Sequence, residues 1–136
     1  MRTKKVIFSL FVMLYALSSS AYDALIDGIY YNLSGSEATV TNKDNNYISY
    51  SDTVFIPSSV TYNGSTYSVT AIGSYAFREC KSLTSISIPS SVRAIFDHAF
   101  QYCEGLTELV IPEGVDSIAE YAFEGLKNLQ SAKLPS

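Results

Sequence analysis

The chain has 136 residues, of which 13 are acidic and 9 basic, so its formal net charge is −4 at neutral pH. Three of the basic residues lie within the first five positions, and the rest of the chain carries about −7. This balance argues against nucleic acid as a partner, because phosphates require a surplus of Lys and Arg, and it argues equally against anionic membrane surfaces.

Residues 1–21 are predicted to be a signal peptide. A positively charged start precedes an apolar run at residues 6–17, and small residues at 19–21 provide a cleavage site. The run is too short to span a membrane. Cleavage after Ala21 is therefore expected to give a secreted or surface-exposed chain that does not insert into a membrane. An uncleaved anchor is the alternative interpretation.

Residues 22–68 are predicted to form a β-rich N-terminal cap that contains a degenerate first coil. The string Ile-Pro-Ser-Ser-Val at residues 56–60 recurs letter for letter at residues 88–92. Asn63-Gly64, flanked by Tyr and Thr, is a strong hairpin signal. A second hairpin is expected from residues 29–33 and 38–41, around a Ser-Gly-Ser-Glu turn.

Residues 69–136 contain three copies of a 23-residue pattern that begin at Val69, Val92 and Val115. A fixed period of this size predicts a solenoid, in which each coil buries its apolar face only by stacking on its neighbours. The third copy stops one residue short of full length. The columns expected to fill the core hold Phe77, Phe100 and Phe123, then Leu83, Leu106 and Leu129.

Each repeat is predicted to combine a parallel strand with a short helical turn, which defines an α/β solenoid. In the first repeat, Ile86 and Ile88 alternate with Ser85 and Ser87, the period of two that a half-buried strand requires. In the return arm of the second repeat, Ala99 and Cys103 are four residues apart, so one helical turn would point both inward.

Cys80 and Cys103 occupy the same column of adjacent repeats. Stacked coils would place their Cα atoms about 4.8 Å apart, which is within the range of a disulfide. The third repeat has Leu126 in this column, which indicates a buried apolar position that a thiol also fills well. A disulfide and two buried thiols are both consistent with the sequence.

The sequence contains no nucleophile elbow, phosphate-binding loop or paired zinc ligands, so we expect no enzymatic activity, no cofactor and no metal. The single histidine, His98, is expected to be a turn residue. The edge of the third repeat, including Ile118, Phe123 and Leu126, is expected to be apolar and exposed. Such a surface predicts association with another chain or with a further segment.

Two surfaces are candidates for ligand binding. The first is the outward side of the stacked strands. The second is a column of aromatic side chains, to which Tyr102 could contribute a further ring. The strand face is expected to carry two ladders, Ser85, Glu108 and Ser131 in one and Ser87, Val110 and Lys133 in the other, and the aromatic column holds Tyr75, His98 and Tyr121.

The pattern Val-x-x-Ile-x-x-x-Ala-Phe-x-x-Cys-x-x-Leu-x-x-Ile-x-Ile-Pro, as it stands from Val69 to Pro89, resembles the BspA-like leucine-rich repeat. It returns with small changes up to Pro112, and the third copy departs with Leu126 and Ala132. That family comprises mostly bacterial surface and secreted proteins. The resemblance implies ligand binding at the strand face and a role in adhesion to a protein or cell-surface partner. A structural unit that assembles end to end, or a glycan-directed enzyme accessory, are the alternatives.

Overall fold

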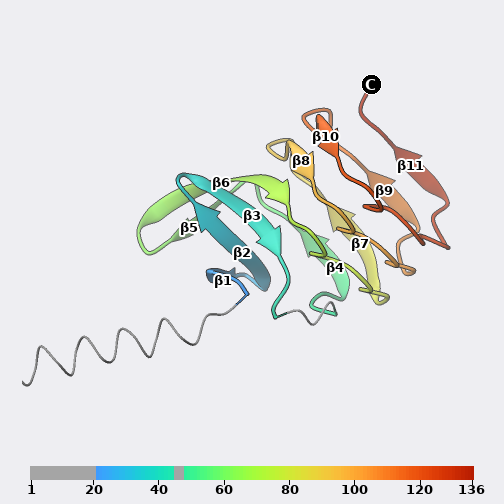
Figure 1. Cartoon of the computed structure of the whole chain (residues 1–136), viewed down its shortest axis with the longest axis horizontal. Coiled ribbons are helices and arrows are strands. Elements are labelled where there is room, and N and C mark those ends of the chain that lie inside the picture. The colour runs from blue at the N-terminus through green and yellow to red at the C-terminus, as the bar shows by residue number, and fades with distance from the viewer. Residues whose placement is uncertain (1–20, 45–47) are drawn as a thin grey trace, which may run out of the picture.

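The structure is a computed structural model that describes residues 21–44 and 48–136, so the expected signal peptide lies outside the described residues apart from Ala21. Strands and turns make up the described part, in which there is no helix (Figure 1). The strands are β1 (Ala24–Ile26), β2 (Ile29–Ser34), β3 (Glu37–Thr41), β4 (Asp52–Phe55), β5 (Ser59–Tyr62), β6 (Ser65–Ile72), β7 (Leu83–Ser87), β8 (Ala94–Ile95), β9 (Glu108–Val110), β10 (Ser117–Ile118) and β11 (Ser131–Lys133).

Both hairpins expected in the N-terminal part are present. Strands β5 and β6 pair antiparallel around Asn63-Gly64, whose φ angles of 49° and 80° are those of a type I′ turn. Strands β2 and β3 pair antiparallel in one register along their length. A third hairpin, not predicted from the sequence, joins β1 to β2 through Asp27-Gly28. Asp-Gly is a turn signal of the same kind.

One sheet continues from the N-terminal strands into the repeats. Its order is β1-β2-β3-β6-β8-β10, and the pairs from β3 onward are parallel. Strand β6 crosses the boundary expected between residues 68 and 69, so the N-terminal strands and the first repeat share one strand. The N-terminal strands thus lie at the end of the coil stack (Figure 1).

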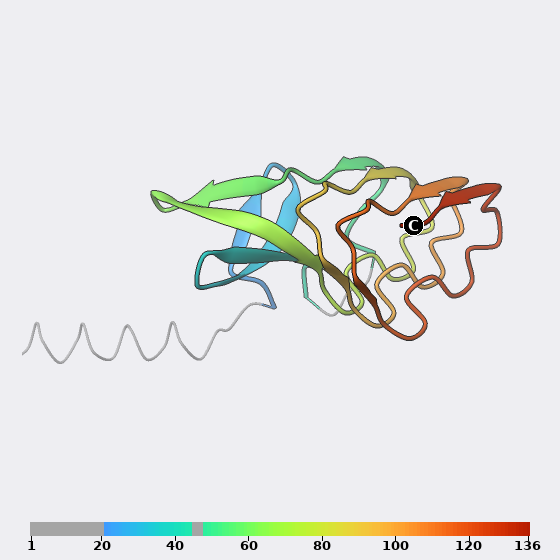
Figure 2. The same ribbon diagram turned by 90° about the horizontal axis from the view of Figure 1, so that it is seen from above.

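A second row of strands lies on the opposite side of the coils. Strands β4, β7, β9 and β11 run side by side there, facing away from β6, β8 and β10 (Figure 2). The pairs β4–β7 and β9–β11 are parallel, and each pair forms a separate two-stranded sheet. Because β4 leads into the repeated Ile-Pro string at residues 56–57, it adds a degenerate coil below the first clear repeat.

The return arms differ from the expected helical turn. In the first repeat the N–H groups of Ala76, Arg78 and Cys80 donate to carbonyls three residues earlier, at 3.1 to 3.2 Å. Tyr75 and Glu79 have φ of 59° and 57°, and a left-handed residue interrupts an α-helix. The arms are therefore chains of single turns. The same two columns are left-handed at His98 and Tyr102, and at Tyr121 and Gly125.

The intervening N–H groups of the first two arms bind the next coil. Tyr75, Phe77 and Glu79 donate to the carbonyls of Asp97, Ala99 and Gln101 at 3.2, 2.8 and 2.7 Å. The second arm repeats this pattern: His98, Phe100 and Tyr102 donate to Glu120, Ala122 and Glu124. Half of the arm's backbone donors thus depend on the neighbouring coil.

The core is a row of stacked rings between the two strand rows. Phe77 and Phe100 are fully buried, with ring centroids 5.0 Å apart and planes inclined by 1°. Phe123 continues the row at 5.7 Å and is only partly buried. Tyr50 extends it below the first repeat, 4.6 Å from Phe77. In the leucine column Leu83 and Leu106 are fully buried and Leu129 is partly buried.

The two cysteines are buried thiols and form no disulfide. The Cys103 Sγ donates instead to the Phe77 carbonyl oxygen at 2.8 Å. Burial raises the pKa of both thiols, because it disfavours the thiolate. The column therefore acts as an apolar core position, and the bridge considered from the sequence is not formed.

Phe100→Ala tests the stacked core. The substitution removes a ring that packs on both sides, so it should cost about 3–5 kcal/mol, a large part of the roughly 5–15 kcal/mol available to a domain. Phe96→Ala is the matched control, because Phe96 is 46% exposed. Thermal melts followed by circular dichroism should show a large loss of Tm for Phe100→Ala alone. An unchanged Tm in that variant would contradict the packing scheme.

Candidate binding surfaces

The strand face brings the expected ladder residues together. Ser131 pairs with Glu108, and Lys133 pairs with Val110. Strand β4 adds a member to each ladder, because Thr53 pairs with Ser85 and Phe55 with Ser87. All of these side chains are exposed. The two β4 residues were not predicted from the sequence, although the repeated Ile-Pro string at residues 56–57 gives their position in the coil.

The strand face combines apolar and polar groups on a rigid backbone. Phe55 is 71% exposed, and Val110 is exposed in the same ladder. Glu108 and Lys133 supply one charge of each sign, and Ser131 pairs with Glu108 on the neighbouring strand. An exposed aromatic ring surrounded by hydrogen-bonding groups is typical of a protein-binding surface.

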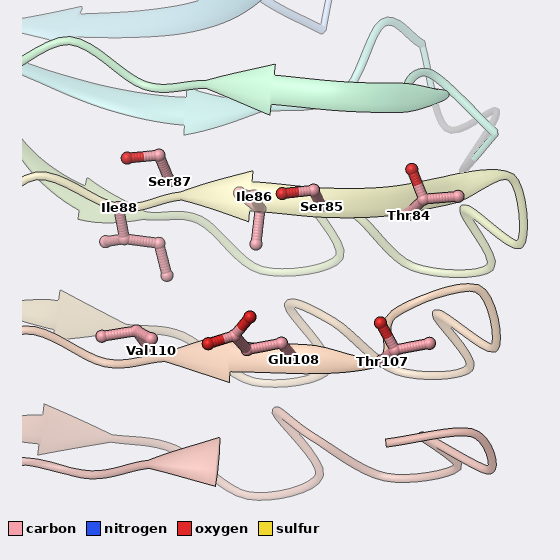
Figure 3. A pocket seen from close by; sticks show the side chains of 8 residues that line it. All are labelled: Thr84, Ser85, Ile86, Ser87, Ile88, Thr107, Glu108 and Val110. Atoms are coloured by element: carbon pink, nitrogen blue, oxygen red, sulfur yellow. The ribbon is translucent and has the colours of Figure 1, made fainter. Parts of the chain in front are cut away.

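Two hollows open on this face. A groove of about 390 Å³ lies between β7 and β9 and is lined by residues 84–88 together with Thr107, Glu108 and Val110 (Figure 3). A second hollow of about 540 Å³ lies between the β1–β2 turn and β4, beside Phe55. The face is therefore indented and offers places into which a ligand could project.

The aromatic column forms a stack at the edge of the arms. The Tyr75 and His98 rings lie 4.9 Å apart at 16°, and the His98 and Tyr121 rings lie 5.1 Å apart at 30°. The inner ring faces therefore cover one another. Tyr102 lies outside the stack and packs against Gly125, where an added Cβ would come within 2.2 Å of the Tyr102 ring.

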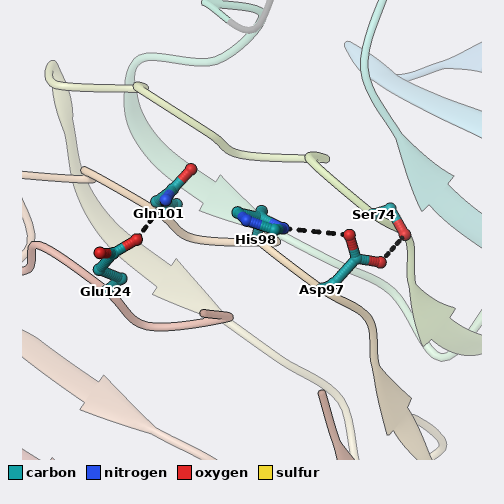
Figure 4. A network of polar contacts seen from close by, with 5 residues as sticks. All are labelled: Ser74, Asp97, His98, Gln101 and Glu124. Atoms are coloured by element: carbon teal, nitrogen blue, oxygen red, sulfur yellow. Dashed lines mark hydrogen bonds and ion pairs between the residues drawn. The ribbon is translucent and has the colours of Figure 1, made fainter. Parts of the chain in front are cut away.

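Asp97 joins the aromatic stack to the neighbouring coil (Figure 4). The Ser74 hydroxyl donates to Asp97 Oδ1 at 2.5 Å, and His98 Nδ1 lies 3.0 Å from Asp97 Oδ2. These hydrogen bonds, that from Ser74 first, lower the pKa of Asp97 because they stabilise the carboxylate. Nearby, the Gln101 amide donates to Glu124.

This network does not have the geometry of an activated nucleophile. Ser74 and His98 both bind the Asp97 carboxylate, whereas a catalytic serine donates its proton to the histidine. In the described ranges 21–44 and 48–136, no three His, Cys, Asp or Glu side chains gather as metal ligands. The arrangement is suited to hold one coil against the next.

The outer edge of the third coil is partly apolar. Ile118 is 43% exposed and Leu134 is 59% exposed, while Phe123, Leu126 and Leu129 are partly buried. Within the part of the chain that the structure describes, the Tyr121, Phe123 and Gly125 N–H groups have no acceptor. These correspond to the donors that bind the next coil in the first two arms.

The repeated coils define a leucine-rich repeat solenoid. The model of the family described as "BspA type Leucine rich repeat region (6 copies)" matches residues 49–136, which is more than half of the chain. The chain belongs to the BspA-type leucine-rich repeat family. The match includes the degenerate coil that contains β4. Comparison with curated proteins gives no match.

Solved leucine-rich repeat structures share the fold. A protein from Bacteroides ovatus is 28% identical, with a TM-score of 0.55 over 84% of this chain and 42% of its own. One from Bacteroides capillosus is 22% identical, with a TM-score of 0.59 over 88% of this chain and 100% of its own. The T. pallidum leucine-rich repeat protein is 21% identical, with a TM-score of 0.51 over 83% and 72%. This chain thus spans less than half of the Bacteroides ovatus protein.

Ser74→Ala tests the hydrogen bond that stabilises the Asp97 carboxylate. Loss of the donor should raise the pKa of Asp97 toward its ordinary value. Because the folded-state pKa is lowered, the carboxylate favours folding above the unfolded pKa of about 4, and this contribution is lost as the pH falls through the folded value. NMR titration of the carboxyl carbon measures the change, with Ser131→Ala as the control. An Asp97 pKa that is unchanged in Ser74→Ala would contradict the assignment.

Proposed function

We propose that this protein is a secreted or cell-surface module that binds a protein or cell-surface partner through its strand face. The observation that carries the proposal is the pair of exposed ladders across β4, β7, β9 and β11, with Phe55 and Val110 in one of them. Family membership supports a role in binding, since leucine-rich repeats generally mediate protein interactions. The leader-like segment at residues 1–21 supports export.

The rigid coil stack supports this use of the strand face. Alternate side chains of each strand point inward and hold the core, while the outward ones need only tolerate water. Outward residues can therefore be selected for a ligand without loss of folding. Among the described residues there is no helix long and apolar enough to cross a membrane.

Phe55→Ala tests the strand face directly. Immobilised protein comprising residues 22–136 is used to capture proteins from cell-surface and extracellular-matrix extracts, and the captured proteins are quantified by mass spectrometry. A buried aromatic anchor contributes about 2 kcal/mol or more to an interface, so capture of the specific partner should fall at least about tenfold.

Phe96→Ala is the matched control for this experiment, because it removes an exposed ring on the opposite strand row. Capture that is equal for the wild type, Phe55→Ala and Phe96→Ala would remove the strand face from consideration.

Self-assembly through the third coil is a second candidate function. The exposed side chains of Ile118 and Leu134 and the open backbone donors of that coil favour it. Sedimentation velocity should then show concentration-dependent association that Ile118→Asp with Leu134→Asp abolishes and Phe55→Asp leaves intact. A wild-type protein that stays monomeric at the highest concentration reached would rule this candidate out.

A further inference from the structure

The strand face is interrupted between its second and third strands, β7 and β9. Between β4 and β7 the Ile56 N–H donates to the Ser87 carbonyl at 3.0 Å, and between β9 and β11 the Ile111 N–H donates to the Lys133 carbonyl at 2.8 Å. The corresponding bond from the Ile88 N–H to the Val110 carbonyl is not formed, and β7 and β9 belong to different sheets. On the opposite row, β6, β8 and β10 pair without a break.

Close backbone contacts hold both ends of this opening. A Cβ on Gly105 would lie 2.5 Å from the Lys81 carbonyl oxygen, and one on Gly114 would lie 2.5 Å from the Ser90 carbonyl oxygen. The two coils therefore touch before β9 begins and after it ends. The other repeats have Ser82 and Asn128 in the column of Gly105, and Ser91 in the column of Gly114. Both glycines are thus particular to the second repeat.

The groove between these contacts is lined by hydrogen-bonding groups. The side chains of Glu108 in β9 and of Thr107 just before it extend toward β7, and the Ser85 hydroxyl lies along β7 (Figure 3). Ser87 also lines the groove, although its hydroxyl points away from β9 (Figure 3). The Ile88 side chain covers part of the wall. Glu108 forms no ion pair or hydrogen bond within the described residues. Open strand edges and a carboxylate in one groove require partners from solvent or a ligand.

We propose that this groove binds a sugar unit of a neutral oligosaccharide. Sugar hydroxyls both donate and accept hydrogen bonds, so they can satisfy the free N–H of Ile88, the free carbonyl of Val110 and the Glu108 carboxylate together. The groove volume of about 390 Å³ lies within the range of small-ligand sites. The exposed Phe55 ring, one strand beyond Ser87, offers an apolar surface for a neighbouring sugar.

Other ligands fit this groove less well. An inserted peptide strand would need about 9.6 Å between β7 and β9, twice the ordinary strand spacing, and the contacts at Gly105 and Gly114 hold the coils closer than that. Glu108 disfavours an anion. A single carboxylate without a second acidic ligand is a poor site for a divalent cation.

Titration calorimetry with cellohexaose, maltohexaose and chitohexaose tests this inference on a protein comprising residues 22–136. At least one of the three sugars should bind the wild type, and Glu108→Gln and Thr107→Val should each weaken its binding at least tenfold. Ser117→Ala is the control, because Ser117 is an exposed residue of β10, on the opposite strand row and outside the groove. Thermal melts establish that each variant is folded.

Two results would overturn the inference: none of the three sugars binds, or the sugar that binds does so equally well in Glu108→Gln and Thr107→Val. A peptide that binds in a Glu108-dependent manner while the sugars do not would also overturn it. The inference rests on the proposed use of the strand face, but the experiment can contradict sugar binding without contradicting that proposed function. Phe55-dependent capture of a protein partner without sugar binding would leave the proposed function intact.

Discussion

The structure depends on the division of backbone hydrogen bonds between each coil and its neighbour. In the first two arms, alternate N–H groups close a turn within the coil, and the ones between them donate to the next coil. Neither set suffices alone, because a single coil would leave half of its arm donors without acceptors and its phenylalanine exposed. Stacking satisfies both needs in one step, so the apolar core and the backbone network form together.

This division also explains the aromatic stack at the edge of the arms. Tyr75, His98 and Tyr121 all have left-handed φ angles, which cost on the order of 1 kcal/mol or more for a residue with a side chain. Their rings stack on one another, and Asp97 links His98 to Ser74 of the coil below. These contacts offset the backbone strain. The stack thus has a structural role that accounts for it, which leaves the strand face as the stronger candidate for binding.

The sequence predicted the features that recur in fixed columns and missed those that depart from them. The phenylalanine row and the Asn63-Gly64 hairpin are confirmed, because side-chain size and turn chemistry determine them locally. The helical turn was wrong because Ala99 and Cys103 point inward equally well from a chain of single turns. Tyr50 and Phe55 were missed since an inserted hairpin shifts the degenerate coil out of the 23-residue period.

The opening between β7 and β9 is a harder case for prediction from sequence. The inward strand residues Ile86 and Leu109 follow the same pattern as elsewhere, so the apolar columns give no sign that the ladder breaks at this level. One local departure is the pair Gly105 and Gly114, which permits the coils to touch at two points on either side of β9. A regular sequence can therefore build an irregular surface.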